Sequence, residues 1–161
     1  MDESVKICAK ALRDFNKKSE RPLTFALSTY VVQSLIKVVR IFDQPVGTGL
    51  LIGVGGTYKK SLALLAAHIC GIKTFNFTKD VRRVDQETWR EGLKRVMLLT
   101  GFEGHPHMLL ADGSNLLTME QMDDLNAFLT LKYIPGLHSK EEQKAIASRI
   151  AEKEGIENLS P

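Results

Sequence analysis

The residues best suited to chemistry lie between Gly53 and Ser61, where the sequence reads GVGGTYKKS. A glycine-rich turn leaves backbone N–H groups bare, and a helix that begins directly after the turn directs its positive end to the same place. A lysine at the start of that helix can reach the outer phosphates of a nucleotide. The pattern therefore predicts a phosphate-binding P-loop between a strand and a helix.

This stretch departs from the P-loop template GxxxxGK[ST] at two positions. Gly53 and Lys59 match the first glycine and the lysine, whereas Tyr58 occupies the second glycine and Lys60 the hydroxyl position. A positive φ at Tyr58 would cost about 1 kcal/mol or more. Lys60 cannot ligate Mg²⁺, and Ser61 could do so only if the helix began one residue later. The alternative interpretation is a glycine-rich turn without a ligand.

A second candidate group follows the apolar run Met108–Ala111. Asp112 ends that run as the acid of a Walker B segment does, and such an acid holds Mg²⁺ through water. The next residue is Gly113, where ATPases of this kind commonly have the glutamate that activates the attacking water. An aspartate after a strand is also a common turn or capping residue. The candidate metal ligand is thus Asp112, and we identify no catalytic residue.

The candidate nucleotide-binding residues are Gly53, Gly55, Gly56, Thr57, Lys59, Lys60 and Ser61.

Other reactive side chains give weaker signals. His105 and His107 match no zinc-site spacing, so we expect no metal there. Cys8 and Cys70 lie among apolar residues outside any CxxC pair, which argues against a disulfide framework and fits a reducing compartment. Trp89 has helical spacing from other apolar residues and is expected in the core.

The composition is that of a globular domain with a hydrophobic core. The chain has 161 residues, of which 43% are hydrophobic and 25% are charged. The net charge of +3 is small and its basic residues alternate with acidic ones, so neither nucleic acid nor an anionic membrane is expected as a partner. The sequence has no signal-peptide pattern and no apolar run near ~18 residues, which favours a cytoplasmic protein.

Hydrophobic periodicity predicts two N-terminal helices followed by alternating strands and helices. Strands are expected at 50–52, 74–77 and 107–111, and helices at 3–18, 26–42, 59–70, from Asp85 to Gly101, after Thr118, and at 140–154 with an end at Gly155. Thr118 with Gln121, and Ser139 with Glu142, have the spacing of capping boxes. The fold class is α/β: a partial P-loop NTPase with three αβα layers and a short parallel sheet of about three strands. We expect an N-terminal helical segment at 1–44, the α/β core at 45–138, and a C-terminal helix and tail at 139–161.

With these elements placed, the sequence resembles the fourth AAA+ module of axonemal dynein heavy chains. The likeness covers nearly the whole chain and is carried by Ala11–Asn16, Val39–Phe42, Leu50–Gly56, Ser61–Leu62, Ala66–Ala67, Asp112–Asn115, Asn126 and Ile134–Leu137. The resemblance implies an AAA+ module of a microtubule-based, ATP-driven motor in the cytoskeleton of the cilium or axoneme. Its expected partners are other dynein modules or subunits of the dynein complex, and its association with microtubules is indirect.

The resemblance also implies roles for individual residues. Lys59 would contact the β- and γ-phosphates of ATP or ADP, the loop glycines would form the cradle, and Asp112 would support Mg²⁺. Three residues depart from the family pattern: Tyr58 replaces a glycine, Gly113 replaces the catalytic glutamate of several members, and His138 replaces a phenylalanine. We therefore expect a degenerate site that is structural or weakly ATP-binding, and that does not hydrolyse ATP in the isolated chain.

The resemblance implies further elements beyond Pro161, among them a strand that lies between the first and third strands predicted here. Two alternatives remain at this point. One is a small stand-alone P-loop phosphotransferase, which has a similar length. The other is a non-catalytic ciliary or cytoskeletal interaction domain that binds its partner through an exposed sheet edge.

Overall fold

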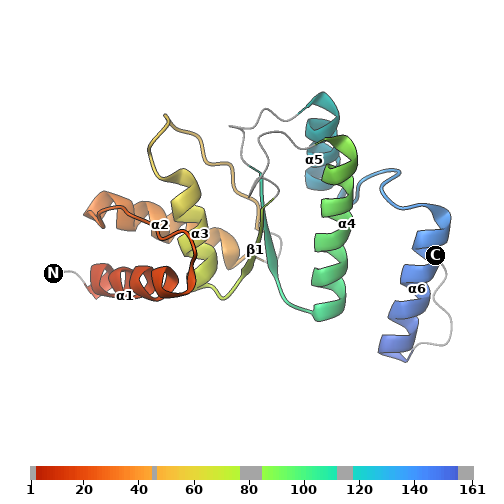
Figure 1. The fold of residues 1–161 in the computed structure, drawn as a ribbon, viewed down its shortest axis with the longest axis horizontal. Coiled ribbons are helices and arrows are strands. Elements are labelled where there is room, and N and C mark those ends of the chain that lie inside the picture. Colours follow the sequence, from red (N-terminus) through yellow and green to blue (C-terminus); the bar gives the residue numbers. More distant parts are fainter. Residues whose placement is uncertain (1–2, 45–46, 77–84, 112–117, 156–161) are drawn as a thin grey trace. The chain divides into compact units, whose positions relative to one another are not determined.

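The computed structural model of the chain describes residues 3–44, 47–76, 85–111 and 118–155. Its elements, in chain order, are α1 (Glu3–Lys18), α2 (Thr29–Phe42), α3 (Lys59–Ile69), β1 (Lys73–Asn76), α4 (Gln86–Glu103), β2 (His107–Leu110), α5 (Met119–Leu131) and α6 (Lys140–Glu154) (Figure 1). They form two compact units, Met1–Phe75 with Pro106–Met108, and Asn76–His105 with Leu109–Pro161. In these ranges no helix has both the length and the apolar character needed to cross a membrane.

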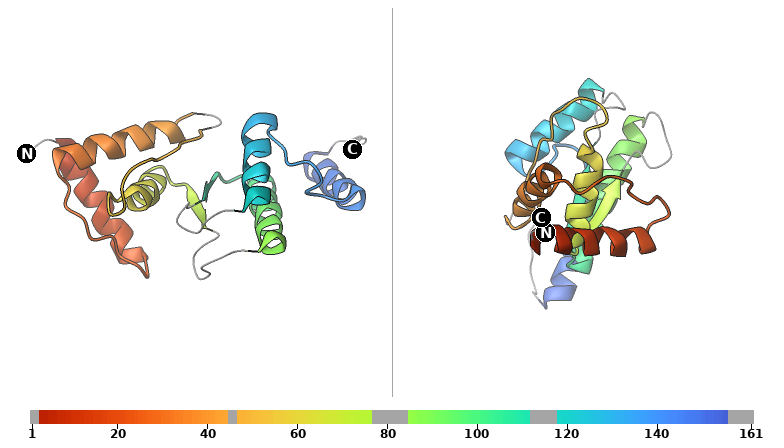
Figure 2. Two further views of the ribbon diagram at one scale, coloured as in Figure 1. Left: turned by 90° about the horizontal axis from the view of Figure 1, so that it is seen from above. Right: turned by 90° about the vertical axis from the view of Figure 1, so that its left-hand side faces the viewer.

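Helices α1, α2 and α3 pack together in the first unit (Figures 1 and 2). Their shared core consists of Cys8, Phe25, Val32, Leu35, Val38, Leu62, Leu65 and Ala66. Helix α3 contributes most to this packing, because its side chains at 62, 63, 65, 66 and 67 are all buried. Burial of so much of a short helix fixes its position, and with it the position of its N-terminal end at Lys59.

The segment between α1 and α2 is held by its own hydrogen bonds. The side-chain amide of Asn16 donates to the carbonyl of Leu23 at 3.0 Å and accepts from the Leu23 N–H at 2.8 Å. Ser28 caps α2 by accepting from the N–H of Val31. Between these two anchors the side chain of Phe25 reaches the core, where only 9% of its surface is exposed.

The sheet has two strands among the described residues, β1 and β2, which pair in parallel. The prediction of a first strand at 50–52 was wrong, because this segment forms no strand and leads irregularly into α3 (Figure 1). Leu50 and Ile52 are both 85% exposed. An apolar run becomes a buried strand only when its backbone hydrogen-bonds to neighbouring strands, and 50–52 joins neither edge of the sheet formed by β1 and β2.

Local capping signals set most helix boundaries in the second unit. Asp85 accepts from the N–H of Thr88 at 2.8 Å at the start of α4, and both predicted capping boxes are present at the starts of α5 and α6. Helix α6 ends at Gly155 as predicted. The predicted end of α4 at Gly101 was wrong, because the helix continues to Gly104, which has the left-handed φ of 68° that a terminating glycine takes.

Trp89 lies in the core of the second unit, as its spacing predicted, with 1% of its surface exposed. The buried residues around it are Leu93, Ile134 and Leu137. A buried carboxylate next to this core links two helices. Asp124 of α5 accepts from Arg90 of α4 at 2.9 and 3.2 Å and from Gln86 at 2.9 Å. Its side chain is 6% exposed. The free-energy cost of burying its charge must therefore be offset by the hydrogen bonds from these donors.

The Asp124→Ala variant should therefore lose about 2 kcal/mol or more of unfolding free energy, because the charged Arg90 group loses its acceptor. The hydrogen bond from Arg90 to Asp124 raises the pKa of Arg90. Without that bond the guanidinium still stays charged at neutral pH, so the variant leaves a charged group without its acceptor. Urea unfolding followed by the fluorescence of Trp89, the single tryptophan of the chain, would measure this change. The matched control is Asp123→Ala on the same helix, where the side chain is exposed and the expected change is within about 0.5 kcal/mol. Equal effects of the two substitutions would contradict the assigned role of Asp124.

Candidate functional site

The predicted phosphate-binding stretch forms a turn directly before α3. Gly56 has a φ of 81° and Tyr58 a φ of 57°, so the chain takes the left-handed conformation twice before the helix begins at Lys59. The hydroxyl of Thr57 donates to the carbonyl of Val54 at 2.9 Å and closes the turn. The structure thus brings the glycines, Thr57 and Lys59 together on one loop at the N-terminus of a buried helix.

The ammonium group of Lys59 lies across this loop. It donates to the carbonyl of Gly53 at 2.8 Å, to the carbonyl of Val54 at 2.7 Å and to the Thr57 hydroxyl at 3.3 Å. A lysine ammonium has three hydrogens to donate, so these three acceptors use its full capacity. A phosphate that binds Lys59 must therefore compete with acceptors from the loop itself.

Gly53 lies close to the Thr57 hydroxyl. A Cβ atom at this position would lie 3.1 Å from the Thr57 hydroxyl oxygen, which is a tight contact, and 3.6 Å from Cδ of Lys59, which is an ordinary one. At Gly55, by contrast, a Cβ would meet nothing within 4 Å. A side chain at position 53 would therefore require the Thr57 hydroxyl to shift by a few tenths of an ångström.

Tyr58 takes the backbone conformation that suits a glycine, with φ 57° and ψ 19°. A non-glycine residue in this region costs about 1 kcal/mol or more. The Tyr58 ring lies against Phe25, with ring centroids 5.3 Å apart and planes inclined by 32°. An aromatic pair of this kind contributes about 0.5–1.5 kcal/mol, which is enough to offset the strain. The tyrosine therefore preserves the backbone path of the loop.

Phe25 is the residue that sequence reasoning missed. It lies far from the loop in sequence, and its apolar neighbours gave it the same signal as any core residue. Only the Asn16 bonds to Leu23 and the packing of the three helices bring it beneath Tyr58. No local pattern could have identified this contact, because it joins the segment before α2 to the segment before α3.

The first turn of α3 is rich in basic residues. The first turn contains Lys59 and Lys60 but no acidic residue, and the capping position, Tyr58, makes no side-chain cap hydrogen bond. A helix N-terminus carries positive dipole charge and unsatisfied N–H groups, so lysines there are unfavourable unless an anion is close. Helices α4, α5 and α6 instead have a capping side chain and an acidic residue in the first turn. This end of α3 is therefore suited to an anion.

The residues of the loop do not fit Mg²⁺. The position that supplies a hydroxyl ligand in the P-loop template is Lys60, a half-buried cation. The Thr57 hydroxyl already donates to Val54 and accepts from Lys59. Asp112, the predicted metal ligand, lies outside the described residues. Within the described ranges no group of three or more His, Cys, Asp or Glu side chains could hold a metal ion.

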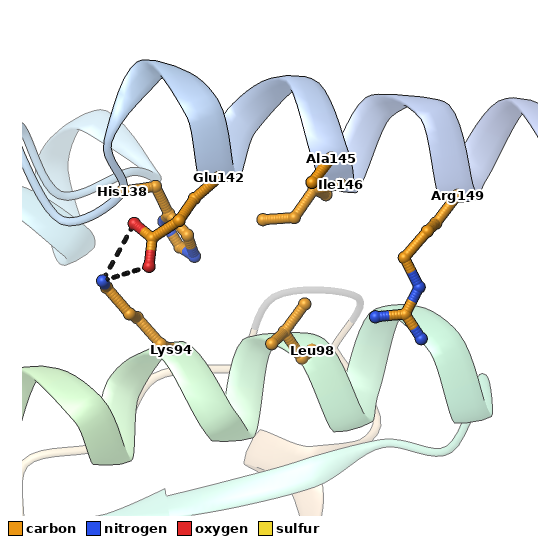
Figure 3. Close-up of a pocket in the computed structure, with 7 residues that line it drawn as sticks. All are labelled: Lys94, Leu98, His138, Glu142, Ala145, Ile146 and Arg149. Carbon is orange, nitrogen blue, oxygen red and sulfur yellow. Dashed lines mark hydrogen bonds and ion pairs between the residues drawn. The ribbon is translucent and has the colours of Figure 1, made fainter.

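A shallow pocket in the second unit offers no chemistry of its own. It lies between α4 and α6 and is lined by Lys94, Leu98, His138, Glu142, Ala145, Ile146 and Arg149 (Figure 3). Lys94 donates to both carboxylate oxygens of Glu142 at 2.7 and 2.9 Å. These hydrogen bonds, together with the one from the Ser139 N–H, hold the pKa of Glu142 below its usual value. The charged groups are therefore engaged in attaching α6 to α4.

The comparisons with known proteins agree on one family. The model of the P-loop containing dynein motor region D4 matches residues 23–160. Human dynein axonemal heavy chain 6 is 27% identical over 146 residues, which are 91% of this chain and 4% of the relative. Human dynein axonemal heavy chain 2 is 28% identical over 152 residues, 92% of this chain and 3% of the relative. The dynein-1-beta heavy chain of the flagellar inner arm I1 complex of Chlamydomonas reinhardtii is 34% identical over 116 residues, 71% of this chain and 2% of the relative. The chain thus spans a few hundredths of the length of these curated relatives.

The strain at Tyr58 predicts an unusual order of stability among variants. The unfolding free energy of Tyr58→Gly should be about 1 kcal/mol higher than that of Tyr58→Ala. Once the ring is gone, only glycine takes the positive φ without strain. Denaturant unfolding followed by far-ultraviolet circular dichroism would measure the difference.

The matched control for this order is Tyr30, which is 78% exposed in the first turn of α2. There the order should reverse, because alanine is favoured over glycine in a helix by up to about 1 kcal/mol. A Tyr58→Ala variant that is more stable than Tyr58→Gly, as expected at Tyr30, would show that Tyr58 does not have a left-handed backbone in solution.

Proposed function

The chain belongs to the family of the P-loop containing dynein motor region D4, and from this premise we propose that its loop at 53–61 binds the phosphates of ATP or ADP without hydrolysing the nucleotide. The observation that carries the proposal is the turn that places the Lys59 ammonium across the loop at the positive end of the α3 dipole. The left-handed backbone at Tyr58 supports it further, because glycine, the template residue at this position, takes such a φ readily.

The absence of hydrolysis is proposed from the sequence after the Walker B run. Gly113 follows Asp112, and a glycine has no side chain to orient or deprotonate an attacking water. Phosphoryl transfer to water depends almost entirely on positioning and charge stabilisation, and it needs a group that places the water. A nucleotide bound at this site would then stabilise the folded module.

Within a whole motor, we propose that the chain acts as an AAA+ module of a microtubule-based dynein in the cilium or axoneme. The relatives support this setting through their names, which are those of axonemal and flagellar dynein heavy chains. The chain's own contact with microtubules would be indirect. Its partners would be other modules of the heavy chain or subunits of the dynein complex.

Thermal unfolding with and without ATP would test nucleotide binding. A ligand that binds only the folded chain at 100 times its Kd stabilises it by about 2.7 kcal/mol, which raises the melting temperature of a protein of this size by several degrees. Lys59→Ala should abolish the ATP-induced shift, because it removes the only charged contact placed across the loop among the described residues.

Two features keep this test specific. Lys37→Ala, which removes an exposed lysine of α2, should leave the shift unchanged. The shift is compared, not the melting temperature itself, because Lys59→Ala also removes hydrogen bonds within the loop. An unshifted melting temperature of the wild-type chain at millimolar ATP, with and without Mg²⁺, would refute nucleotide binding, and steady phosphate release would refute the non-hydrolytic part.

The partner proposal rests on the segment before the loop. Leu50 and Ile52 are each 85% exposed and Val54 is 80% exposed, so apolar side chains face solvent in close succession. Such a segment is a candidate contact with another protein. Ile52→Asp should abolish binding to a purified axonemal dynein motor region that lacks its own D4 module, as measured by light scattering, while Tyr30→Asp, exposed on α2, should not. Binding that survives Ile52→Asp would exclude this segment as the contact.

A further inference from the structure

Four basic side chains follow one another along the exposed face of α1. Lys6, Lys10, Arg13 and Lys17 are all exposed and lie at intervals of four, three and four residues. This spacing places them on one face of a helix, over a length of about 16 Å. The opposite face of α1 packs against α2 and α3, and its Cys8 is buried in their shared core (Figure 1). We refer to the four exposed residues as the basic stripe.

The basic stripe has little compensation from acidic residues of its own helix. Helix α1 has five basic residues and two acidic ones, Glu3 and Asp14, so its net charge of +3 equals that of the whole chain. Lys17 pairs with Asp14 at 3.8 Å, but both side chains are exposed, so this pair offsets little of the charge. Like charges three and four residues apart destabilise a helix. A bound anion would relieve this repulsion.

Exposure of a helix does not by itself produce such a stripe. Helix α6 has no buried residue, yet its four basic residues are accompanied by four acidic ones, and its net charge is zero. Because α1 carries +3, all the residues outside it sum to a net charge of zero. The excess positive charge is therefore concentrated on one exposed helix face of the first unit, and a ligand for that face must be anionic.

We propose that the basic stripe binds an acidic protein segment, in which aspartate or glutamate side chains repeat along one side. The steps of the stripe measure about 4.5–6 Å along the helix axis. Residues on one side of an extended chain repeat about every 6.6 Å, and residues four apart on a helix about every 6 Å. Successive carboxylates of either form can therefore meet successive cations of the stripe. This contact needs no nucleotide and does not depend on the loop at 53–61.

The surroundings of the stripe favour a protein over other polyanions. A helix that lies on an anionic membrane buries its apolar face in the lipid, whereas the apolar face of α1 is already buried in the core of the first unit. Proteins that bind single-stranded nucleic acid add aromatic side chains to their basic groove, and the basic stripe has no aromatic member. A second copy of the chain would present the same positive stripe across a symmetric contact and would be repelled.

Fluorescence anisotropy of a labelled oligoglutamate peptide, titrated with the whole chain, tests this binding. We expect saturable binding at about 0.05 M salt that weakens at about 0.2 M, because salt screens exposed charges. Lys10→Glu combined with Arg13→Glu should raise the Kd about tenfold or more, since each reversal removes one attraction and adds one repulsion. The matched control is Lys37→Glu combined with Lys144→Glu, two exposed lysines outside α1. It makes the same change in net charge and should alter the Kd by less than about twofold.

Equal losses in the two double variants would overturn the role of the stripe, because net charge alone would then explain the binding. Oligodeoxythymidine of matched charge, or vesicles of phosphatidylserine and phosphatidylcholine, are the competing probes. Tighter binding of either one than of oligoglutamate would overturn the assignment to an acidic protein segment. No binding of oligoglutamate to the wild-type chain at about 0.05 M salt would overturn the proposal as a whole. These comparisons use the wild-type chain, so they remain decisive even if a double variant fails to fold.

Discussion

The three hydrogen bonds of the Lys59 ammonium are the contacts on which the candidate site depends. They join the carbonyls of Gly53 and Val54 and the hydroxyl of Thr57 to a side chain that begins on α3. Since α3 is buried against α1 and α2, the core of the first unit fixes the position of the loop. The loop would otherwise be an exposed, glycine-rich segment with many accessible conformations. A single lysine thus connects the packing of the helices to the conformation of the loop at 53–61.

Tyr58 combines a strained backbone with a favourable ring contact. A tyrosine at a positive φ introduces strain, and packing of its ring on Phe25 compensates for part of this strain. The change at the neighbouring position is different in kind, because Lys60 alters charge and leaves the backbone path alone. The two departures from the P-loop template therefore have separate consequences. One concerns the stability of the turn, and the other concerns the charge at the start of α3.

The second unit is held together differently from the first. Its core around Trp89 is small, and much of the attachment between its helices is polar. Arg90 and Gln86 bind Asp124, while Lys94 binds Glu142. Lys153 of α6 also donates to the carbonyl of Phe102, and the Arg149 guanidinium lies 4.4 Å from the centroid of the Phe102 ring. Helix α6 has no buried residue, so its position depends on these contacts more than on apolar packing.

The sequence by itself determined the features that depend on neighbours along the chain. Capping residues at Asp85, Thr118 and Ser139 marked helix starts correctly, because a cap bonds to amides two or three residues away. The place of the glycine-rich turn before α3 followed in the same way from glycines and a lysine directly before an apolar helix. Tertiary structure alone decided the rest. Leu50–Ile52 did not become a strand because a strand needs hydrogen-bond partners from elsewhere in the fold, and Tyr58 tolerates its backbone because Phe25, distant in sequence, lies against its ring.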